Sequence, residues 1–344
     1  MKKRITSNIA LTALGQGVEK GIAFVVIAVL VRYLDKSLMG EYFFAISVLS
    51  LVVLLTEAGT SRHLVRSVAA EKTKAAELLG QVLRFRLTLI AVALVVTNIG
   101  VAIISPDLLE IFLWLSIYIF ANDLYFAFGA TLLGLDAVLK RVLTGLIGPV
   151  ILLALVPLGT TFDWSLRSLL MVHALASVTM VWITWAITVK TTGPPFGKTP
   201  IAEVLQLVAR SMPLFILSLL ILLHARLDEL MLAAITDYSV VATYAAGYKL
   251  LEVSRFAVRP AITVLLPVFT IMAVAADWTS YQRNIRRLIG TAFGIGMLTL
   301  LLVVPTAHYV VPLAFGETYL ATIDVTRILF LGAPALFVSC LLYT

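Results

Sequence analysis

Long runs of apolar residues recur along the whole chain, and they limit what it can fold into. A helix needs about 20 such residues to cross the hydrocarbon core of a bilayer. Ten windows reach or approach that length: 9–31, 42–60, 87–104, 108–133, 142–158, 169–189, 211–235, 239–275, 288–311 and 321–343. The runs are continuous rather than alternating, so they predict helices and not barrel strands. We therefore expect an all-α polytopic membrane protein with ten transmembrane helices.

Composition excludes several other classes of protein. Of the 344 residues, 61% are hydrophobic and 13% are charged. A soluble domain carries about 25% charged residues, and a globule as apolar as this one could not cover its own surface with polar groups. A soluble enzyme, a nucleic-acid-binding module and a disordered chain are therefore excluded. The basic start is interpreted as part of the first transmembrane helix, because the apolar run that follows it carries Glu19 and Lys20 and outlasts a signal peptide.

One window is too long for a single straight span. The window 239–275 contains 37 residues, and splitting it at Pro260 would leave too few residues to cross the bilayer. Proline removes a backbone hydrogen bond and bends a helix. The window is therefore interpreted as one helix, bent near Pro260 and Pro267, that protrudes into the cytoplasm.

The basic residues predict the orientation of the chain. With the N-terminus in the cytoplasm, 17 of the 26 Lys and Arg residues fall in cytoplasmic segments and 4 fall on the external side. This map counts Arg84 and Arg86 among the cytoplasmic residues. Such an excess is the positive-inside signal. It explains the net charge of +7 without any affinity for nucleic acid.

Two segments share the pattern Asp-x-Ser-x-x-x-x-Tyr. Residues 35–42 lie between the first and second spans, residues 237–244 lie between the seventh and eighth, and the offset is 202 residues. The spans before both segments run from inside to outside. The halves are therefore predicted to be parallel repeats of six helices, related by an axis along the membrane normal.

The repeat also predicts the domain boundaries. The N-terminal lobe covers 1–190 with helices 1–6, a cytoplasmic linker covers 191–203, and the C-terminal lobe covers 204–344 with helices 7–10. Because the second half supplies four spans where the first supplies six, we expect a C-terminally truncated sequence that lacks at least two helices. A natural ten-span protein is the alternative.

Several short motifs point to one family. The first half carries Gly15-Gln16-Gly17, Arg32-Tyr33-Leu34, Met39-Gly40-Glu41-Tyr42 and Glu57-Ala58-Gly59. The second half carries Met212-Pro213, Asp228 with Met231-Leu232, Tyr244-Ala245-Ala246, Leu266-Pro267 and Phe315-Gly316-Glu317-Thr318-Tyr319. With these motifs the chain resembles the bacterial and archaeal polysaccharide flippases of the O-antigen type, in the multidrug, oligosaccharidyl-lipid and polysaccharide exporter superfamily. It departs from that family where Asp35 and Ala242 stand, since the family usually has Gly at both places.

The resemblance implies an architecture and a cargo. It implies two six-helix lobes around a central cavity that opens alternately to each side, and a lipid-linked oligosaccharide as the substrate. It places the protein in the plasma (inner) membrane of a bacterium or archaeon, with the N-terminus in the cytoplasm. Expected partners are membrane lipids and polysaccharide-assembly proteins, with no nucleic acid. No cofactor is expected, and H⁺ or Na⁺ coupling stays open.

Ionisable residues within the predicted spans are the candidate functional residues. Each would cost about 2.5–3.5 kcal/mol near a helix centre, so it should face water, a partner side chain or a substrate. Interhelical pairing is the structural alternative, as is snorkelling near a span end. The set holds six acidic and five basic residues, so their number does not predict a cationic cavity. They are Glu19, Lys20, Glu57, Asp123, Arg226, Asp228, Glu229, Lys249, Glu252, Arg255 and Arg259.

The eighth span carries the most ordered set of polar residues. Spacings of 4, 4, 3 and 4 keep five side chains within an arc of about 80°, with Lys249 just beside it: Tyr244, Tyr248, Glu252, Arg255 and Arg259. A stripe this long predicts the lining of an aqueous cavity. Arginine binds phosphate through two parallel hydrogen bonds, so Arg255 and Arg259 are expected to attract the diphosphate of the cargo. Alternatively, both are positive-inside residues.

The other spans supply further candidates. Arg226 and Glu229 are expected to form a pair within one helix, and Glu19 with Lys20 can neutralise each other beside the cavity. The carboxyl groups proposed for ion coupling are those of Asp123, Asp228 and Glu57. Asp123 has no partner nearby in the sequence and can relay protons, while cross-helix hydrogen bonding is the alternative. No metal site and no catalytic residue is predicted.

The favoured function is that of a transporter and not of an enzyme. We expect a flippase that moves a polyprenyl-diphosphate-linked oligosaccharide from the inner to the outer leaflet by alternating access. A multidrug cation antiporter of the same superfamily is the first alternative, and it would need carboxylates to dominate the cavity. A membrane-embedded glycosyl- or acyltransferase is the second, and the lack of a catalytic loop motif counts against it.

Overall fold

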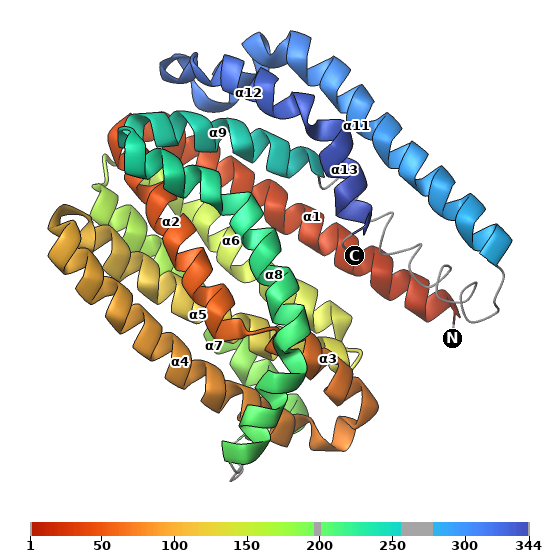
Figure 1. Ribbon diagram of the computed structural model, residues 1–344. Helices are drawn as coiled ribbons and strands as arrows, with labels where there is room; N and C mark the ends of the chain where they lie inside the picture. The colour runs from red at the N-terminus through yellow and green to blue at the C-terminus, as the bar shows by residue number, and fades with distance from the viewer. Residues whose placement is uncertain (1, 196–200, 256–277, 343–344) are drawn as a thin grey trace. The chain divides into compact units, whose positions relative to one another are not determined.

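Helices account for the regular structure of this protein. The computed structural model describes residues 2–195, 201–255 and 278–342, and no strand occurs in these ranges (Figure 1). The long helices are α1 Lys2–Tyr33, α2 Lys36–Glu57, α4 Ala75–Ile104, α5 Leu109–Gly134, α6 Val138–Thr161, α7 Leu166–Thr192, α8 Ile201–Ile235, α9 Tyr238–Ser254 and α11 Trp278–Phe315. The shorter elements are α3 Thr60–Ala70, η1 Lys72–Lys74, η2 Pro106–Leu108, η4 Glu317–Tyr319, α12 Thr322–Leu331 and α13 Ala333–Leu342.

Length and hydropathy identify membrane spans among these helices. The described residues contain seven helices that are long and apolar enough to cross a bilayer, or eight if the bent pair α12 and α13 is one span. A multi-pass membrane protein is therefore confirmed, whereas the number ten is not. The windows 211–235 and 239–275 fall on α8 and α9 and are not among the seven. The bend expected near Pro260 and Pro267 lies outside the described residues.

The last window differs from its prediction. We expected one helix over 321–343, but α12 and α13 meet at an angle of 54°. Pro334 follows the break, and it has no N–H to continue the ladder of hydrogen bonds. Gly296 of α11 packs against this break, where a Cβ atom would lie 2.6 Å from the Cα atom of Pro334. The window is therefore two helices that break next to this proline, and it is one span only if the bent pair crosses the membrane together.

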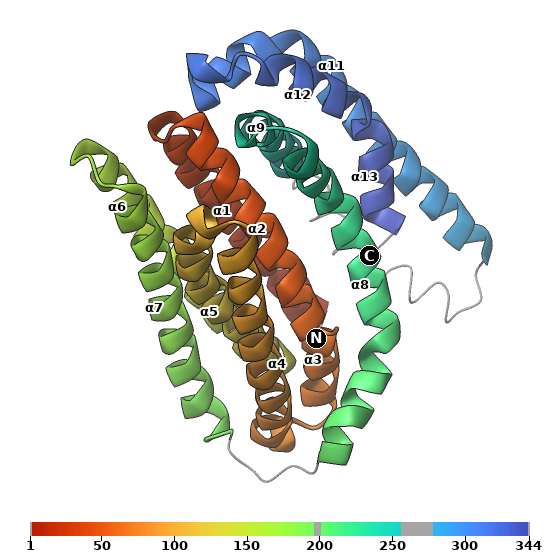
Figure 2. The same ribbon diagram turned by 60° about the vertical axis from the view of Figure 1, so that its left-hand side comes forward.

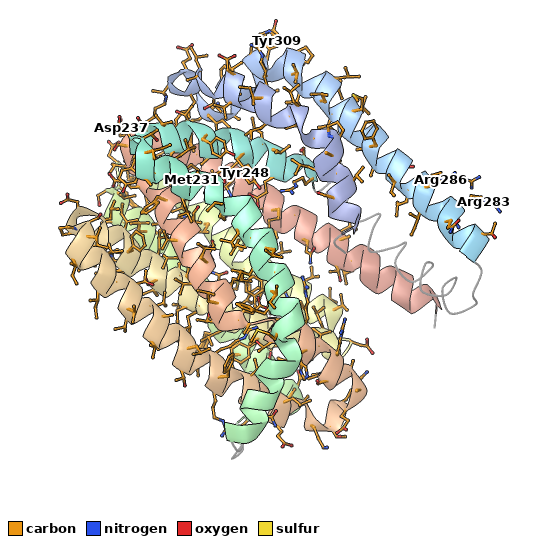
Figure 3. The ribbon with its side chains drawn as sticks, in the orientation of Figure 1. Met231, Asp237, Tyr248, Arg283, Arg286 and Tyr309 are labelled. Atoms are coloured by element: carbon orange, nitrogen blue, oxygen red, sulfur yellow. The ribbon has the colours of Figure 1, made fainter. Side chains whose placement is uncertain are left out.

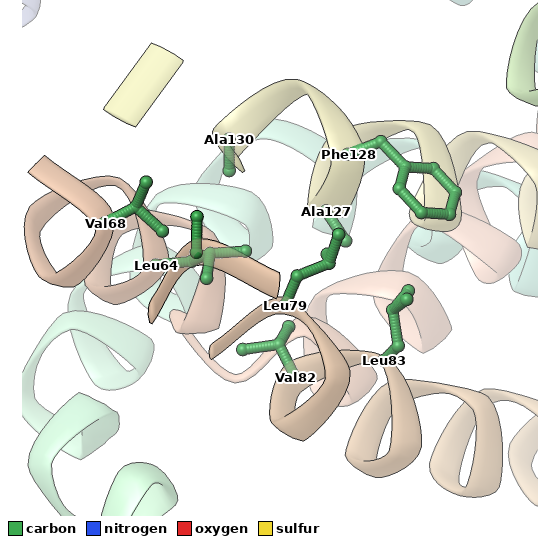
Figure 4. Close-up of a cluster of buried hydrophobic side chains, with 9 residues drawn as sticks. Leu64, Val68, Leu79, Val82, Leu83, Ala127, Phe128 and Ala130 are labelled. Carbon is green, nitrogen blue, oxygen red and sulfur yellow. The ribbon is translucent and has the colours of Figure 1, made fainter. Parts of the chain in front are cut away.

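The chain divides into two compact units, and one of them comprises residues 37–241. Within it α5 lies between α4 and α7, α6 packs on α7, and α3 packs on α5 (Figure 2). A core forms where three helices meet: Leu64 and Val68 of α3, Leu79, Val82 and Leu83 of α4, and Ala127, Phe128 and Ala130 of α5 (Figure 4). Helix α3 is amphipathic, because Arg62 and Arg66 lie on its exposed face. Burial in this core holds α3 against α5 and the first turns of α4.

The other unit comprises residues 1–36 and 242–344, with α1, the part of α9 from residue 242 onward, and α11–α13. Arg32, at the end of α1, donates from Nε to the carbonyl of Ala314 (3.1 Å) and from Nη2 to those of Pro312 (3.2 Å) and Leu313. The last carbonyls of a helix lack partners within the helix and attract a cation. Arg32 therefore ties α1 to the end of α11 and has a structural role on the side predicted to be external.

Candidate functional site

A left-handed turn separates α2 from α3. Ala58 and Gly59 have φ angles of 46° and 72°, in the region that ends a helix and that a residue with a side chain rarely adopts. Helix α2 therefore stops at Glu57, and α3 begins at Thr60 in a new direction. The turn presents Glu57, Thr60 and Ser61 to the same neighbour on α4. The motif Glu57-Ala58-Gly59 thus builds one corner of a polar site.

Arg86 of α4 occupies the centre of this site. Its side chain is fully buried, and all of its nitrogens have partners. Nε donates to Thr60 Oγ1 (2.9 Å), Nη2 donates to Ser61 Oγ (2.6 Å), and Nη2 lies 3.4 Å from Glu57 Oε1. Nη1 donates to both the backbone carbonyl (3.1 Å) and Oδ1 (3.2 Å) of Asp123 on α5. The guanidinium therefore joins four helices, α2 to α5.

This position of Arg86 corrects the predicted map, which counted it as a cytoplasmic residue. The signal that could have found it is its helical phase. On α4 the buried residues Leu79, Leu83, Arg86, Ile90 and Leu94 follow a spacing of three or four, and Arg84 falls outside this series. An arginine in phase with a buried stripe needs acceptors from neighbouring helices. Those acceptors are two of the proposed ion-coupling residues, Glu57 and Asp123.

The two carboxyl groups at Arg86 differ in their surroundings. Asp123 is fully buried, whereas the Glu57 side chain keeps 27% of its surface exposed. Asp123 Oδ2 is buried and accepts no hydrogen bond from the described part of the chain. Two carboxyl groups thus share one guanidinium, and the buried Asp123 Oδ2 has no hydrogen-bond donor among the described residues. Within the described residues, no three His, Cys, Asp or Glu side chains gather as a metal centre would need.

A second charged cluster joins α8 to α2. The predicted pair within the seventh window is confirmed, with Arg226 Nη1 3.1 Å from Glu229 Oε2. Glu229 is fully buried and also accepts a hydrogen bond from Ser47 of α2. Asp228 Oδ1 accepts the backbone N–H of Glu229 (2.9 Å). This cluster therefore pairs the buried carboxylate of Glu229 with the guanidinium of Arg226 and ties α8 to α2.

The predicted polar stripe lies on α9, in the other unit. The rings of Tyr244 and Tyr248 stack at 6.4 Å, and Arg255 Nη1 donates to the hydroxyl of Tyr248 (3.3 Å). These contacts agree with one shared face. Lys249 and Glu252 form an ion pair at 2.8 Å beside it. Arg255 Nε is buried and donates to no acceptor among the described residues. Arg259 lies outside the described residues.

The candidates on the first span belong to the same unit as α9. Lys20 is exposed and Glu19 is half-buried on α1. Their proposed place in the lining of a cavity stays a prediction.

Comparisons with known proteins describe both the sequence and the fold. A family model described as "Polysaccharide biosynthesis protein" matches residues 5–273, and no curated protein matches by sequence. One similar solved structure is an inward-facing multidrug resistance MATE family transporter of the MOP superfamily (TM-score 0.73, 13% identity, covering 94% of this chain and 80% of that chain). An outward-facing multidrug resistance MATE family transporter of the MOP superfamily gives a TM-score of 0.68 at 14% identity, covering 98% of this chain and 82% of that chain. A mutant of the Vibrio cholerae MATE transporter VcmN gives a TM-score of 0.58 at 17% identity, covering 98% of this chain and 82% of that chain. At such identities the likeness shows the fold alone.

Proposed function

The chain belongs to the polysaccharide biosynthesis protein family, and from that premise we propose that it is a flippase for a polyprenyl-diphosphate-linked oligosaccharide. The polar head of the cargo passes through the protein while the lipid tail stays in the membrane. The N-terminus is in the cytoplasm, and the cargo moves from the inner to the outer leaflet of a bacterial or archaeal plasma membrane. The lobes 1–190 and 204–344 rock about the linker 191–203 to alternate access.

The polar stripe on α9 carries this proposal. A helix that holds two stacked tyrosines and an ion pair along its length, with Arg255 directly after its last residue, would be unfavourable against hydrocarbon. Arg255 keeps one buried N–H without an acceptor in the described part of the chain, so its guanidinium retains capacity for a phosphate oxygen. Tyrosines beside it provide flat surfaces for sugar rings. Together these groups suit an anionic, sugar-bearing head.

The orientation has support in α11. Arg283 and Arg286 lie near its start and Tyr309 lies toward its other end (Figure 3). A basic cluster at one end of a span belongs on the cytoplasmic side, and an aromatic residue near the other end suits the membrane interface. This direction puts the start of α11 inside, as the proposed topology requires.

A multidrug cation antiporter is a weaker proposal. Such a cargo needs free carboxylates, whereas Glu57, Asp123 and Glu229 all lie within 3.4 Å of an arginine. The multidrug description of the similar solved structures belongs to those proteins. A membrane-embedded transferase has no supporting observation among the described residues.

The test is transfer of a labelled lipid-linked oligosaccharide between the leaflets of reconstituted vesicles. A charge-assisted hydrogen bond contributes about 1.5–3 kcal/mol, so Arg255→Ala should slow transfer by about tenfold or more. Arg255→Lys keeps the charge but not the planar fork and should retain part of the rate.

Arg283→Ala is the matched control, because Arg283 is an exposed arginine at the cytoplasmic end of α11. Its transfer rate should equal that of the unchanged protein. Absence of any transfer would refute the flippase proposal. Equal rates in Arg255→Ala and Arg283→Ala would remove the role assigned to Arg255.

A further inference from the structure

In one buried charge cluster of residues 37–241, a single guanidinium group lies between carboxyl groups. Arg86 faces two, those of Glu57 and Asp123, at 3.4 and 3.2 Å. Glu57, Arg86 and Asp123 all lie in candidate membrane spans. These spans are Lys36–Glu57, Lys72–Ile104 and Pro106–Gly134, in that order. With both carboxyl groups ionised, the cluster would hold one uncompensated negative charge in a medium that disfavours it.

A cation must offset that charge, and the geometry distinguishes between cations. Sodium binds several oxygens at once and is repelled by other cations. Here the guanidinium of Arg86 already occupies the space between the carboxyl groups and donates to Thr60, Ser61 and Asp123. A proton needs only one oxygen. Asp123 Oδ2, buried and without a donor in the described ranges, is the oxygen available.

We propose that Glu57 and Asp123, held by Arg86, form a proton-binding site that couples proton entry to cargo export, an inference that rests on the proposed flippase function. A proton from the outer aqueous phase forms an O–H bond with Asp123 Oδ2, and the carboxylate loses its charge. Arg86 then balances Glu57 alone. When the O–H bond breaks, the same proton leaves to the cytoplasm and Arg86 again faces two carboxylates.

The neighbours of the site determine its charge and its link to the fold. The charged groups that act on Asp123 are Arg86 from α4 and Glu57 from α2, and α3 supplies the neutral hydroxyls of Thr60 and Ser61. Glu57 stands next to the left-handed turn that ends α2. A change of charge at Asp123 therefore acts on the junction of α2 with α3, within the N-terminal lobe.

The first experiment detects the bound proton without transport. Infrared difference spectra of the protein in vesicles, recorded across a pH titration, should show one carboxylic acid band that appears as the pH falls. Asp123→Asn should abolish it. Glu57→Gln should abolish it as well, because the remaining carboxylate then pairs one-to-one with Arg86.

Asp136→Asn is the matched control, since Asp136 forms an exposed ion pair with Lys72 at 2.9 Å and its left-handed backbone also suits Asn. This variant should keep the titrating band. Absence of the band in the unchanged protein, or its survival in Asp123→Asn, would overturn the proposal.

The second experiment measures coupling. If one proton enters for each cargo exported, the steady-state ratio of cargo between leaflets should change about tenfold per pH unit across the vesicle membrane. A sodium gradient should have no effect. Asp123→Asn should still move cargo down its own gradient but without any response to pH.

The two proposals fail in different ways. Transfer that ignores the pH gradient, or that follows sodium, would overturn the proton site and leave the flippase function in place. Absence of transfer under every gradient, with the titrating carboxyl band present, would refute the flippase function and the coupling but not the proton-binding site itself.

Discussion

Arg86 is the residue on which the bundle of residues 37–241 most depends. Arg86→Met removes the guanidinium that stabilises the carboxyl groups of Glu57 and Asp123. Both carboxyl groups then lose this cationic partner inside the protein. Breaking a buried ion pair from one side destabilises by about 3–5 kcal/mol. We therefore expect a lower midpoint of unfolding for the purified protein in detergent, measured by thermal or denaturant titration.

Arg84→Met is the control for that prediction, two positions away on the same helix. Arg84 is exposed, and its Nε donates to the carbonyl of Gly80 in its own helix at 3.4 Å. Its loss should change the free energy of unfolding by less than about 1 kcal/mol. If both variants unfold at the same midpoint, Arg86 is not the organising residue of this site.

At the scale of elements, close approach of helices makes specific glycines necessary. A Cβ atom on Gly40 of α2 would lie 1.8 Å from the carbonyl oxygen of Tyr238 at the start of α9. Gly40→Ala therefore forces the backbones apart, and overpacking of this kind destabilises by about 1–3 kcal/mol. Gly100→Ala, on α4 with no atom within 4 Å, should be neutral or stabilising. If the unfolding midpoints of both variants shift in the same direction, the close approach at Gly40 is not what makes this glycine necessary.

The turn between α2 and α3 supplies an opposite prediction. Ala58 holds a φ angle of 46°, which is strained for a residue with a side chain. Ala58→Gly should relieve that strain and raise the free energy of unfolding by about 1 kcal/mol. Val52→Gly, in the interior of α2, is the contrast and should lower it. A loss of stability in Ala58→Gly would mean that the methyl group of Ala58 matters more than its backbone.

Helices that cross the membrane could be predicted from sequence because each is a long apolar run. Helix α3 could not, since its 11 residues are amphipathic and too short for such a run. The break before Pro334 was missed because an apolar stretch continues on both sides of it. Likewise, Asp123 and Glu57 were identified as buried charges, but their common partner depends on contacts between α2, α4 and α5 that periodicity alone leaves open.

At the scale of the whole molecule, the division of the chain into compact units falls at the two segments from which the repeat is predicted. The chain passes from one compact unit to the other at 36–37 and again at 241–242, inside the two copies of the Asp-x-Ser-x-x-x-x-Tyr segment. Each unit thus combines the first helix of one half with later helices of the other half. This reciprocal grouping supports two equivalent halves, while the lobe boundaries at 190 and 204 stay a prediction.

Cysteine labelling tests whether those halves run parallel. Asp35 and Asp237 are exposed and occupy the same position in the two repeats. In a protein whose Cys340 is replaced by Ser, Asp35→Cys and Asp237→Cys should both react with a membrane-impermeant maleimide added to intact cells. Glu71→Cys, exposed after α3, should react only after the membrane is permeabilised, because the basic residues around it belong on the cytoplasmic side. An inverted repeat would instead place positions 35 and 237 on opposite sides, so labelling of one without the other would remove the parallel arrangement and the rocking motion that depends on it.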